Sequence, residues 1–358
     1  MGNYTGNAII AKAKSLYGHR LKTEDYEELL KFNSVSEIIT YLKKNDKYSN
    51  TLTDVIEYST HRGQLEELIK KSYFNNTVRI VKFVGTKDKK FYELDMIRRE
   101  IEIILKSVRS VISGNIESSI RDLPLFFKQH ASFDIGDLSS SLTMQDILKA
   151  LQGTRYFEII KPYNSEDPAY IKYSEIEHAL YVQYHDIVIT RINQYYKGKT
   201  RRILMDIYQS KVEIENVIKI YRLKKFYNAS KEEILQTLMT NNIRMSKKKL
   251  NDLINLTDAN EILNVLSKSQ FAEFKDKDDY VYIEYQAGKI KYNLAKRYMY
   301  FSNNPPIVYI VFLYLNDIER SNIFNIIEGV RYDIEKEDIK KMLIYWEEYN
   351  GKRKIKTI

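Results

Sequence analysis

A helical pattern recurs three times along this chain of 358 residues, and it constrains the fold more than any other feature. The stretch RLKTEDYEELLKFNSVSEIITYLKK, from Arg20, aligns without a gap with RMSKKKLNDLINLTDANEILNVLSK, from Arg244. The segment IGDLSSSLTMQDILKAL, from Ile135, fits the same template 109 residues after the first copy and 115 before the third. Because the spacing is nearly constant, the sequence predicts three degenerate copies of one helical unit.

Each copy of this pattern reads as a short helical hairpin. In the first copy, Thr23 stands at the predicted cap position before EDYEELLKF, which places acidic residues in the first helical turn. Ser34 and Glu37, three residues apart, predict a capping box that begins the second helix. The apolar positions then form one buried seam: Tyr26, Leu29, Leu30, Val35, Ile38, Ile39 and Leu42.

A second motif recurs with the same period and predicts a longer hairpin in each copy. Glu-x-x-Asn followed by aliphatic residues begins at Glu213 and Glu319, whereas Ile103 replaces the Asn after Glu100. Fifteen residues upstream of each glutamate stands a turn signal, at Gly85, Gly198 and Asn304-Pro305. The predicted fold is therefore all-α, with three similar helical domains at 1–115, 116–228 and 229–358, the last with a C-terminal helix.

Composition supports this class and excludes several others. The chain has 5 Pro, 12 Gly and no cysteine, so disulfides and thiolate chemistry are excluded. The clearest alternating run is YVYIEYQ at 280–286, which fits a strand or the edge of a helix. We expect no signal peptide and no transmembrane helix, because the longest apolar run, Pro306 to Leu315, is too short for a membrane span.

No motif predicts catalysis, a cofactor or a metal. Gly198-Lys199-Thr200 resembles the end of a phosphate-binding loop, but Asn193 stands where that loop requires glycine. His178 and His185 lie seven residues apart on one helix face, whereas a helical zinc site needs three or four, so a structural role is predicted. The motif glutamates recur in different copies, which argues against a single active site.

The net charge of +9 is concentrated in one region. Residues 197–249 contain 14 Lys/Arg and 5 Asp/Glu, so they account for the whole excess. Basic residues also gather beside two of the predicted turns, and if three similar domains close around an axis these turns share one rim. The candidate partner-contact residues are Lys87, Lys89, Lys90, Lys197, Lys199, Arg201 and Arg202. The alternative is that exposed hairpin ends are simply rich in lysine.

The N-terminal segment NAIIAKAKSLYGHRLKTEDYEELLKFNSVSEIITYLKK resembles the C subunits of bacterial and archaeal V/A-type ATPases, relatives of the d subunits of eukaryotic V-ATPases. Leu21, Thr23, Asp25, Tyr26, Leu29 and Leu30 carry the match, and the segments at Glu213 and Glu319 also fit the family. The resemblance implies a funnel or socket of three helical domains around a pseudo-threefold axis. The family pattern supplies no catalytic residues to transfer.

The resemblance also implies a function. Such subunits are non-catalytic, lie in the cytoplasm on the membrane rotor ring, and link the ring to the central shaft subunits of D and F type. Rotation then couples ATP hydrolysis or synthesis to proton or sodium transport. We expect a monomer in isolation, peripheral to the cell membrane through the complex, without nucleic acid or cofactor.

Two other functions remain open from the residues alone. A basic helical-repeat adaptor would bind nucleic acid or an acidic protein through 197–249, with binding that falls steeply with salt. An enzyme would need a pair of titratable groups in a cleft between copies.

Overall fold

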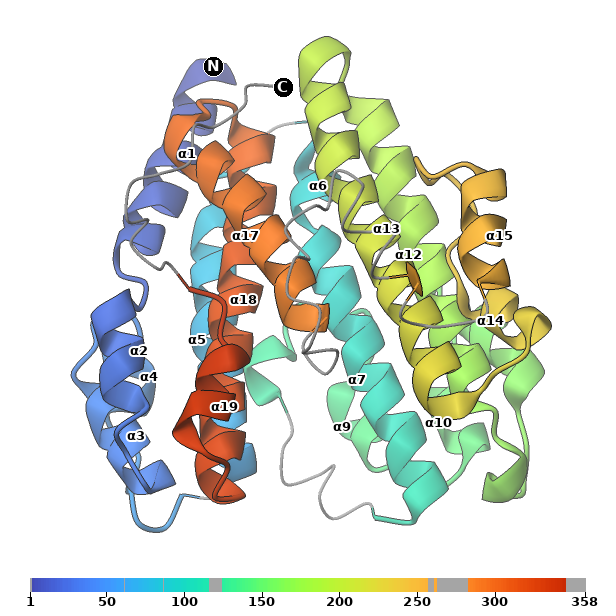
Figure 1. Cartoon of the computed structure of the whole chain (residues 1–358), viewed down its shortest axis with the longest axis horizontal. Coiled ribbons are helices and arrows are strands. Elements are labelled where there is room, and N and C mark those ends of the chain that lie inside the picture. Colours follow the sequence, from blue (N-terminus) through green and yellow to red (C-terminus); the bar gives the residue numbers. More distant parts are fainter. Residues whose placement is uncertain are drawn as a thin grey trace.

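Helices form all the regular secondary structure in the part of the chain that can be described (Figure 1). The computed structural model describes residues 2–60, 62–85, 87–115, 124–256, 261–262 and 283–345. The all-α prediction is confirmed for these residues. From Ile283 onward, the run that alternates like a strand belongs to a helix, and its residues 280–282 lie outside the described ranges.

Three pairs of long helices form the body of the molecule, and each pair turns at a predicted breaker. Between α5 and α7, the turn includes Gly85 and the short helix α6 (Lys89–Tyr92). Gly198 begins the second helix of the next pair with a φ of +56°, a conformation that glycine adopts readily. Pro305 occupies the first turn of α18, where its missing N–H costs no hydrogen bond. The long helices are α5 (Arg62–Val81), α7 (Leu94–Ser113), α12 (Tyr173–Tyr195), α13 (Gly198–Tyr227), α17 (Ile283–Phe301) and α18 (Pro305–Arg331).

Two of the predicted short hairpins are present in full, and their caps explain where their helices begin. Of the third, the structure shows the first helix, and most of the segment predicted for the second, after Leu256, lies outside the described residues. Ser34 Oγ accepts the N–H of Glu37 at 3.3 Å, so the predicted capping box is confirmed. In the second copy, Thr143 and Asp146 form the same box. The cap of the first helix is Lys22 and not Thr23, because the Lys22 N–H donates to the Asp25 carboxylate. The hairpin helices are α2 (Thr23–Leu29), α3 (Val35–Lys43), α9 (Ile135–Ser139), α10 (Met144–Ala150) and α15 (Lys247–Asn255).

Other helices connect and cover these units. At the N-terminus, α1 (Gly2–Gly18) packs against α18 and α5. Its Ala13 belongs to a large apolar cluster with fully buried residues of α18 such as Val308 and Val311. The shorter elements are α4 (Ser49–Leu52), α11 (Phe157–Ile160), α14 (Lys231–Thr237), α19 (Lys336–Lys341) and 3-10 turns at 125–127, 161–163 and 168–170.

Each short hairpin packs against the second helix of a long pair. The apolar seam of α9 and α10 shares a cluster with Ile101 of α7. The seam of α15 shares one with Val217 of α13. The seam of α2 and α3, at the start of the chain, shares one with Ile323 of α18, near its end. The two ends of the sequence are therefore joined in one core.

The three recurring glutamates lie at these same contacts, and all are buried. Glu100 accepts hydrogen bonds from the Ser132 N–H and, at 2.6 Å, from the Tyr156 hydroxyl. Glu213 lies 3.8 Å from Arg244, and burial raises the pKa of its carboxyl above the usual range. The motif therefore serves contacts between segments that are distant in sequence.

Glu319 makes the most extensive of these contacts. Lys47 lies 2.9 Å from its carboxylate with both side chains buried, and the hydroxyls of Tyr48 and Tyr73 donate to the same oxygen. Burial lowers the pKa of Lys47, and the charge of Glu319 opposes that shift. Two residues of the loop after α3 and one of α5 are thus fixed to α18.

The Asn of the same motif holds the backbone of the following segment. Asn322 donates to the Ile344 carbonyl at 2.7 Å and accepts the Ile344 N–H at 2.8 Å. Asn216 makes the same pair of bonds with Met239. One amide side chain thus satisfies both polar groups of a backbone residue, as a neighbouring strand would.

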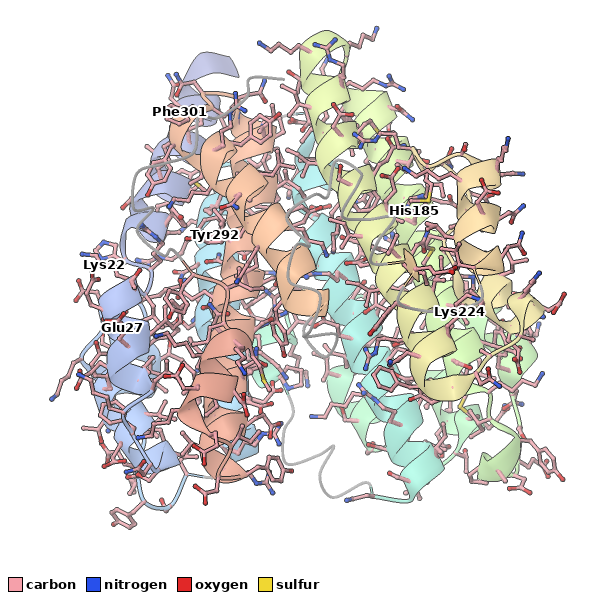
Figure 2. All side chains as sticks on the ribbon, in the orientation of Figure 1. Lys22, Glu27, His185, Lys224, Tyr292 and Phe301 are labelled. Carbon is pink, nitrogen blue, oxygen red and sulfur yellow. The ribbon has the colours of Figure 1, made fainter. Side chains whose placement is uncertain are left out.

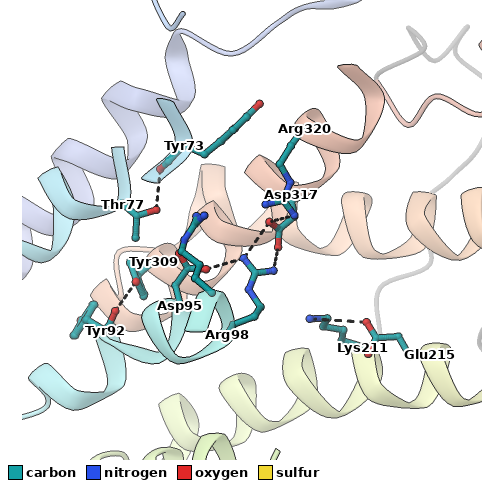
Figure 3. Close-up of polar contacts among 11 residues, drawn as sticks. Tyr73, Thr77, Tyr92, Asp95, Arg98, Lys211, Glu215, Tyr309, Asp317 and Arg320 are labelled. Carbon is teal, nitrogen blue, oxygen red and sulfur yellow. Dashed lines mark hydrogen bonds and ion pairs between the residues drawn. The ribbon is translucent and has the colours of Figure 1, made fainter. Parts of the chain in front are cut away.

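A second, partly buried charge cluster joins α7 to α18 (Figure 3). Arg98 binds both oxygens of Asp317 and lies 2.7 Å from Asp95, which also accepts from Arg99. Arg320 lies 3.2 Å from Asp317 on the same helix. Burial would raise the pKa of Asp317, but Arg98 and Arg320 outweigh it and hold the pKa well below its usual range.

Replacing Glu319 with leucine should lower the free energy of unfolding by about 3–5 kcal/mol, because Lys47 is left charged and buried without its partner. Urea unfolding would measure the change, and the Lys47→Met/Glu319→Leu double variant should recover a large part of it. The matched control is Glu28→Gln, which removes an exposed pair with Lys31 and should cost less than about 1 kcal/mol. Equal losses for Glu319 and Glu28 would contradict this account.

Asp317 should make the stability depend on acid pH. A carboxyl whose folded pKa is lowered stabilises the fold fully above its unfolded pKa, near 3.9, and the contribution disappears as pH falls through the folded value. We expect Asp317→Asn to cost roughly 3 kcal/mol at pH 7 and to flatten the loss of stability below about pH 4. Urea unfolding at pH 7 to 3 measures both, with the exposed Asp338→Asn as control. An unchanged acid slope in Asp317→Asn would refute the role.

Candidate partner interface

The seven candidate residues all lie exposed at the turns of the first two long helix pairs. Lys87, Lys89 and Lys90 stand at the turn that contains α6, and Lys197, Lys199, Arg201 and Arg202 stand at the turn between α12 and α13. Figure 1 shows the α12–α13 turn and the α17–α18 turn at the upper end of the molecule, with α6 lower and behind. We call these three turns, at 83–92, 196–202 and 300–306, the rim.

Direct contacts join the three turns of the rim. The Tyr196 hydroxyl donates to Asp88 at 2.7 Å, and the Tyr196 ring meets Phe91 edge-on at 5.0 Å. Asn304 donates to the Thr200 hydroxyl at 2.8 Å, which ties the second turn to the third. The basic residues of the first two turns are therefore held on one surface.

The aromatic anchor of the rim is Tyr196. Its side chain is buried, which raises the pKa of its hydroxyl above the usual range, and Tyr92 and the Asp88 carboxylate add to this effect. The hydroxyl therefore stays protonated and donates to Asp88. Lys197 and Lys199 follow closely in the chain and lie exposed to solvent.

The basic residues of the rim have few charged partners of their own. Lys89 lies 3.9 Å from Glu93, and Arg201 donates to the Asn193 side chain. Within the described ranges, the six candidates other than Lys89 have no ion pair with a carboxylate. A shallow hollow of about 640 Å³ follows the second turn and is lined by Gly198, Lys199, Arg201, Arg202, Met205, Asp206 and Gln209. The arrangement suits an acidic partner surface.

Exposed aromatic side chains accompany the charges, and the sequence reasoning missed them. Phe301, labelled at the upper left of Figure 2, is 82% exposed, and its neighbour Tyr300 is 48% exposed. Phe83, at the first turn, is 45% exposed. The sequence signal that could have identified them is an aromatic residue near a turn-breaking residue and outside the buried apolar stripe of the helix. Aromatic residues and arginine are enriched in protein interfaces, whereas lysine is more typical of their polar periphery.

His185, one of the two histidines weighed as metal ligands, makes the contacts of a structural residue. His185 Nε2 lies 2.9 Å from the Asn241 carbonyl, its ring stacks on Tyr208, and burial lowers its pKa. The described residues bring no three His, Asp or Glu side chains together as metal ligands. Among the helices described, none is long and apolar enough to span a membrane.

Comparison with known proteins gives a consistent result. The family model described as ATP synthase (C/AC39) subunit matches residues 9–342. The chain is 23% identical over 354 residues to the C subunit of an A-type ATP synthase from Archaeoglobus fulgidus, covering 95% of this chain and 98% of the relative. It is 19% identical over 264 residues to the C subunit of the A-type ATP synthase of Methanosarcina mazei, covering 74% of this chain and 70% of the relative.

Proposed function

The chain belongs to the ATP synthase (C/AC39) subunit family, and from this membership we propose how it works in the rotary complex. It is the C subunit of an A/V-type ATP synthase, a non-catalytic component of the central stalk. In our proposal it receives the central shaft subunits of D and F type and passes their rotation to the membrane rotor ring. It lies on the cytoplasmic side and is a monomer outside the complex.

The rim supports a docking role. It combines six basic residues that lack carboxylate partners in the described structure with exposed aromatic side chains. Such a surface matches an acidic partner that also offers apolar contacts. The proposed role needs two docking faces, one for the shaft subunits and one for the membrane rotor ring. We assign the rim to one of these faces, with the seven basic residues as contacts.

The proposed architecture is a socket of three similar units around a pseudo-threefold axis. It is supported by the recurrence of one arrangement, in which a buried glutamate of a long helix meets residues that flank a short hairpin. Glu100 and Glu213 make this contact along the chain, and Glu319 makes it with the first hairpin. A closed set of such contacts would resist twisting, which torque transmission requires.

A pull-down of the tagged chain from gently solubilised membranes would test the coupling function. We expect the ring-forming membrane subunit and the shaft subunits to be recovered together and identified by mass. If neither is recovered and nucleic acid is retained in a salt-sensitive manner, the rotor proposal fails and the basic adaptor takes its place.

Charge reversal tests the rim itself. Changing Lys87, Lys197 and Lys199 together to glutamate should weaken recovery of partner subunits at least about tenfold, because attraction becomes repulsion. The matched control reverses Lys247, Lys248 and Lys249, which are three exposed lysines at the start of α15. Thermal unfolding should be nearly unchanged in both triple variants. Equal recovery from the two variants would remove the rim from the interface.

A further inference from the structure

A short segment between α14 and α15, on the right of Figure 1, is fastened to the body of the molecule by polar side chains. It comprises residues 238–246, contains no helix, and is called the strap below. Three of its backbone carbonyls accept hydrogen bonds from side chains of α12 and α13. These are Met239 with Asn216 at 2.7 Å, Asn241 with His185 at 2.9 Å, and Asn242 with Gln209 at 2.7 Å. Because Asn241 and Asn242 are exposed, the strap can leave α12 and α13 without unfolding either helix.

One of these side chains, His185, can change its charge near neutral pH. Figure 2 labels it on the right of the molecule. Because a carbonyl oxygen only accepts, Nε2 carries the proton that is donated to Asn241. The ring stacks on Tyr208 with the ring centres 5.5 Å apart, and His185 is only 2% exposed. The other ring nitrogen, Nδ1, is buried and has no hydrogen-bond partner among the described residues. The site therefore suits the neutral ring.

The groups around the ring do not stabilise a second proton. Burial lowers the pKa of His185, and neither the bond to Asn241 nor the charge of Asp186 compensates for this effect. Tyr208 stays uncharged, because burial raises the pKa of its hydroxyl. A proton on Nδ1 would place a charge and an unsatisfied donor inside the protein. Release of the strap would bring the charged ring into contact with water.

Glu213 also holds the strap, but its response to pH has the opposite sign. Its carboxylate lies 3.8 Å from Arg244, which in turn lies 3.7 Å from Asp206. Burial raises the pKa of Glu213, so its contribution to stability is lost as the pH rises. A histidine with a lowered pKa contributes stability above its unfolded pKa, near 6.5, and loses it as the pH falls. Loosening of the strap in weak acid would therefore arise from His185 and not from Glu213.

We propose that His185 is an acid-sensitive latch for the strap. At neutral pH the uncharged ring holds the Asn241 carbonyl, and in weak acid protonation of Nδ1 favours the state in which the strap has left the ring. The strap ends at Ser246, which caps α15 by accepting the Lys249 N–H at 3.2 Å. Its release therefore also loosens the start of α15. This device does not depend on the coupling function.

Hydrogen exchange of the full-length chain at pH 7.5 and pH 5.5 would test the latch. Mass spectrometry follows the peptide that contains the strap, and its rates are divided by those of the same peptide without structure, because exchange itself depends on pH. One pH unit below its unfolded pKa, histidine favours the charged form about tenfold, so protection of the strap should fall by about tenfold. A peptide from α9 and α10, in the second copy, should keep its protection.

Variants show whether His185 is responsible. His185→Gln can still donate to Asn241 but cannot titrate, so protection of the strap should be the same at both pH values. Gln209→Met removes a neighbouring bond, so it should lower protection at both pH values and retain the tenfold response. His19→Gln removes an exposed histidine and should respond like the unaltered chain.

If His185→Gln does not fold, NMR of the ring nitrogens in the unaltered chain decides the question. We expect the neutral, Nε2-protonated form of His185 at pH 7.5, and protonation of the ring in step with the loss of strap protection. Three results would overturn the proposal: constant protection between pH 7.5 and pH 5.5, a full response in His185→Gln, or a protonated ring beneath a strap that stays protected.

Discussion

The ion pair between Lys47 and Glu319 joins the beginning of the chain to its end. A short hairpin such as α2–α3 buries only one apolar seam and cannot form a stable core alone. It gains its core from α5 and α18, and the glutamate of α18 fixes its position through Lys47 and two tyrosines. The other short hairpins receive the same support from α7 and α13. Contacts of one kind therefore hold each hairpin to the second helix of a long pair.

Buried charges specify geometry more than they add stability. Transfer of Lys47, Arg98 and their partners out of water costs several kcal/mol per ion, which the pairing only offsets. The arrangement penalises a shift of α18 along α5 or α7, because any shift would break a buried pair. An apolar contact surface of the same size would tolerate sliding by one helical turn. A protein that transmits rotation benefits from this resistance to sliding.

The sequence of this chain predicts where helices begin and which faces are buried better than it predicts which helices pack together. Ser34 and Glu37 predict a cap because the interaction is complete within four residues. Periodicity also identified which face of each hairpin is buried, but not the helix that covers it, so the pairing of α2–α3 with α18 was not predicted. Lys47 gave no signal at all, since a lysine in a loop usually lies in solvent. Its burial depends on Glu319, 272 residues away.

The rim shows the same difference between features that a few neighbouring residues determine and contacts that depend on the whole fold. The lysines at 87–90 and 197–199 were identified because they adjoin turn breakers, whereas the contacts of Tyr196 with Asp88 and of Asn304 with Thr200 depend on how the three turns meet. Lys47 and Arg99, which are buried, and Arg98, which is partly buried, are paired with carboxylates inside the fold. The rim, by contrast, carries basic residues at hairpin ends, where no interior contact requires them. The stability of the fold therefore does not account for their position, and our proposal assigns them to a partner surface.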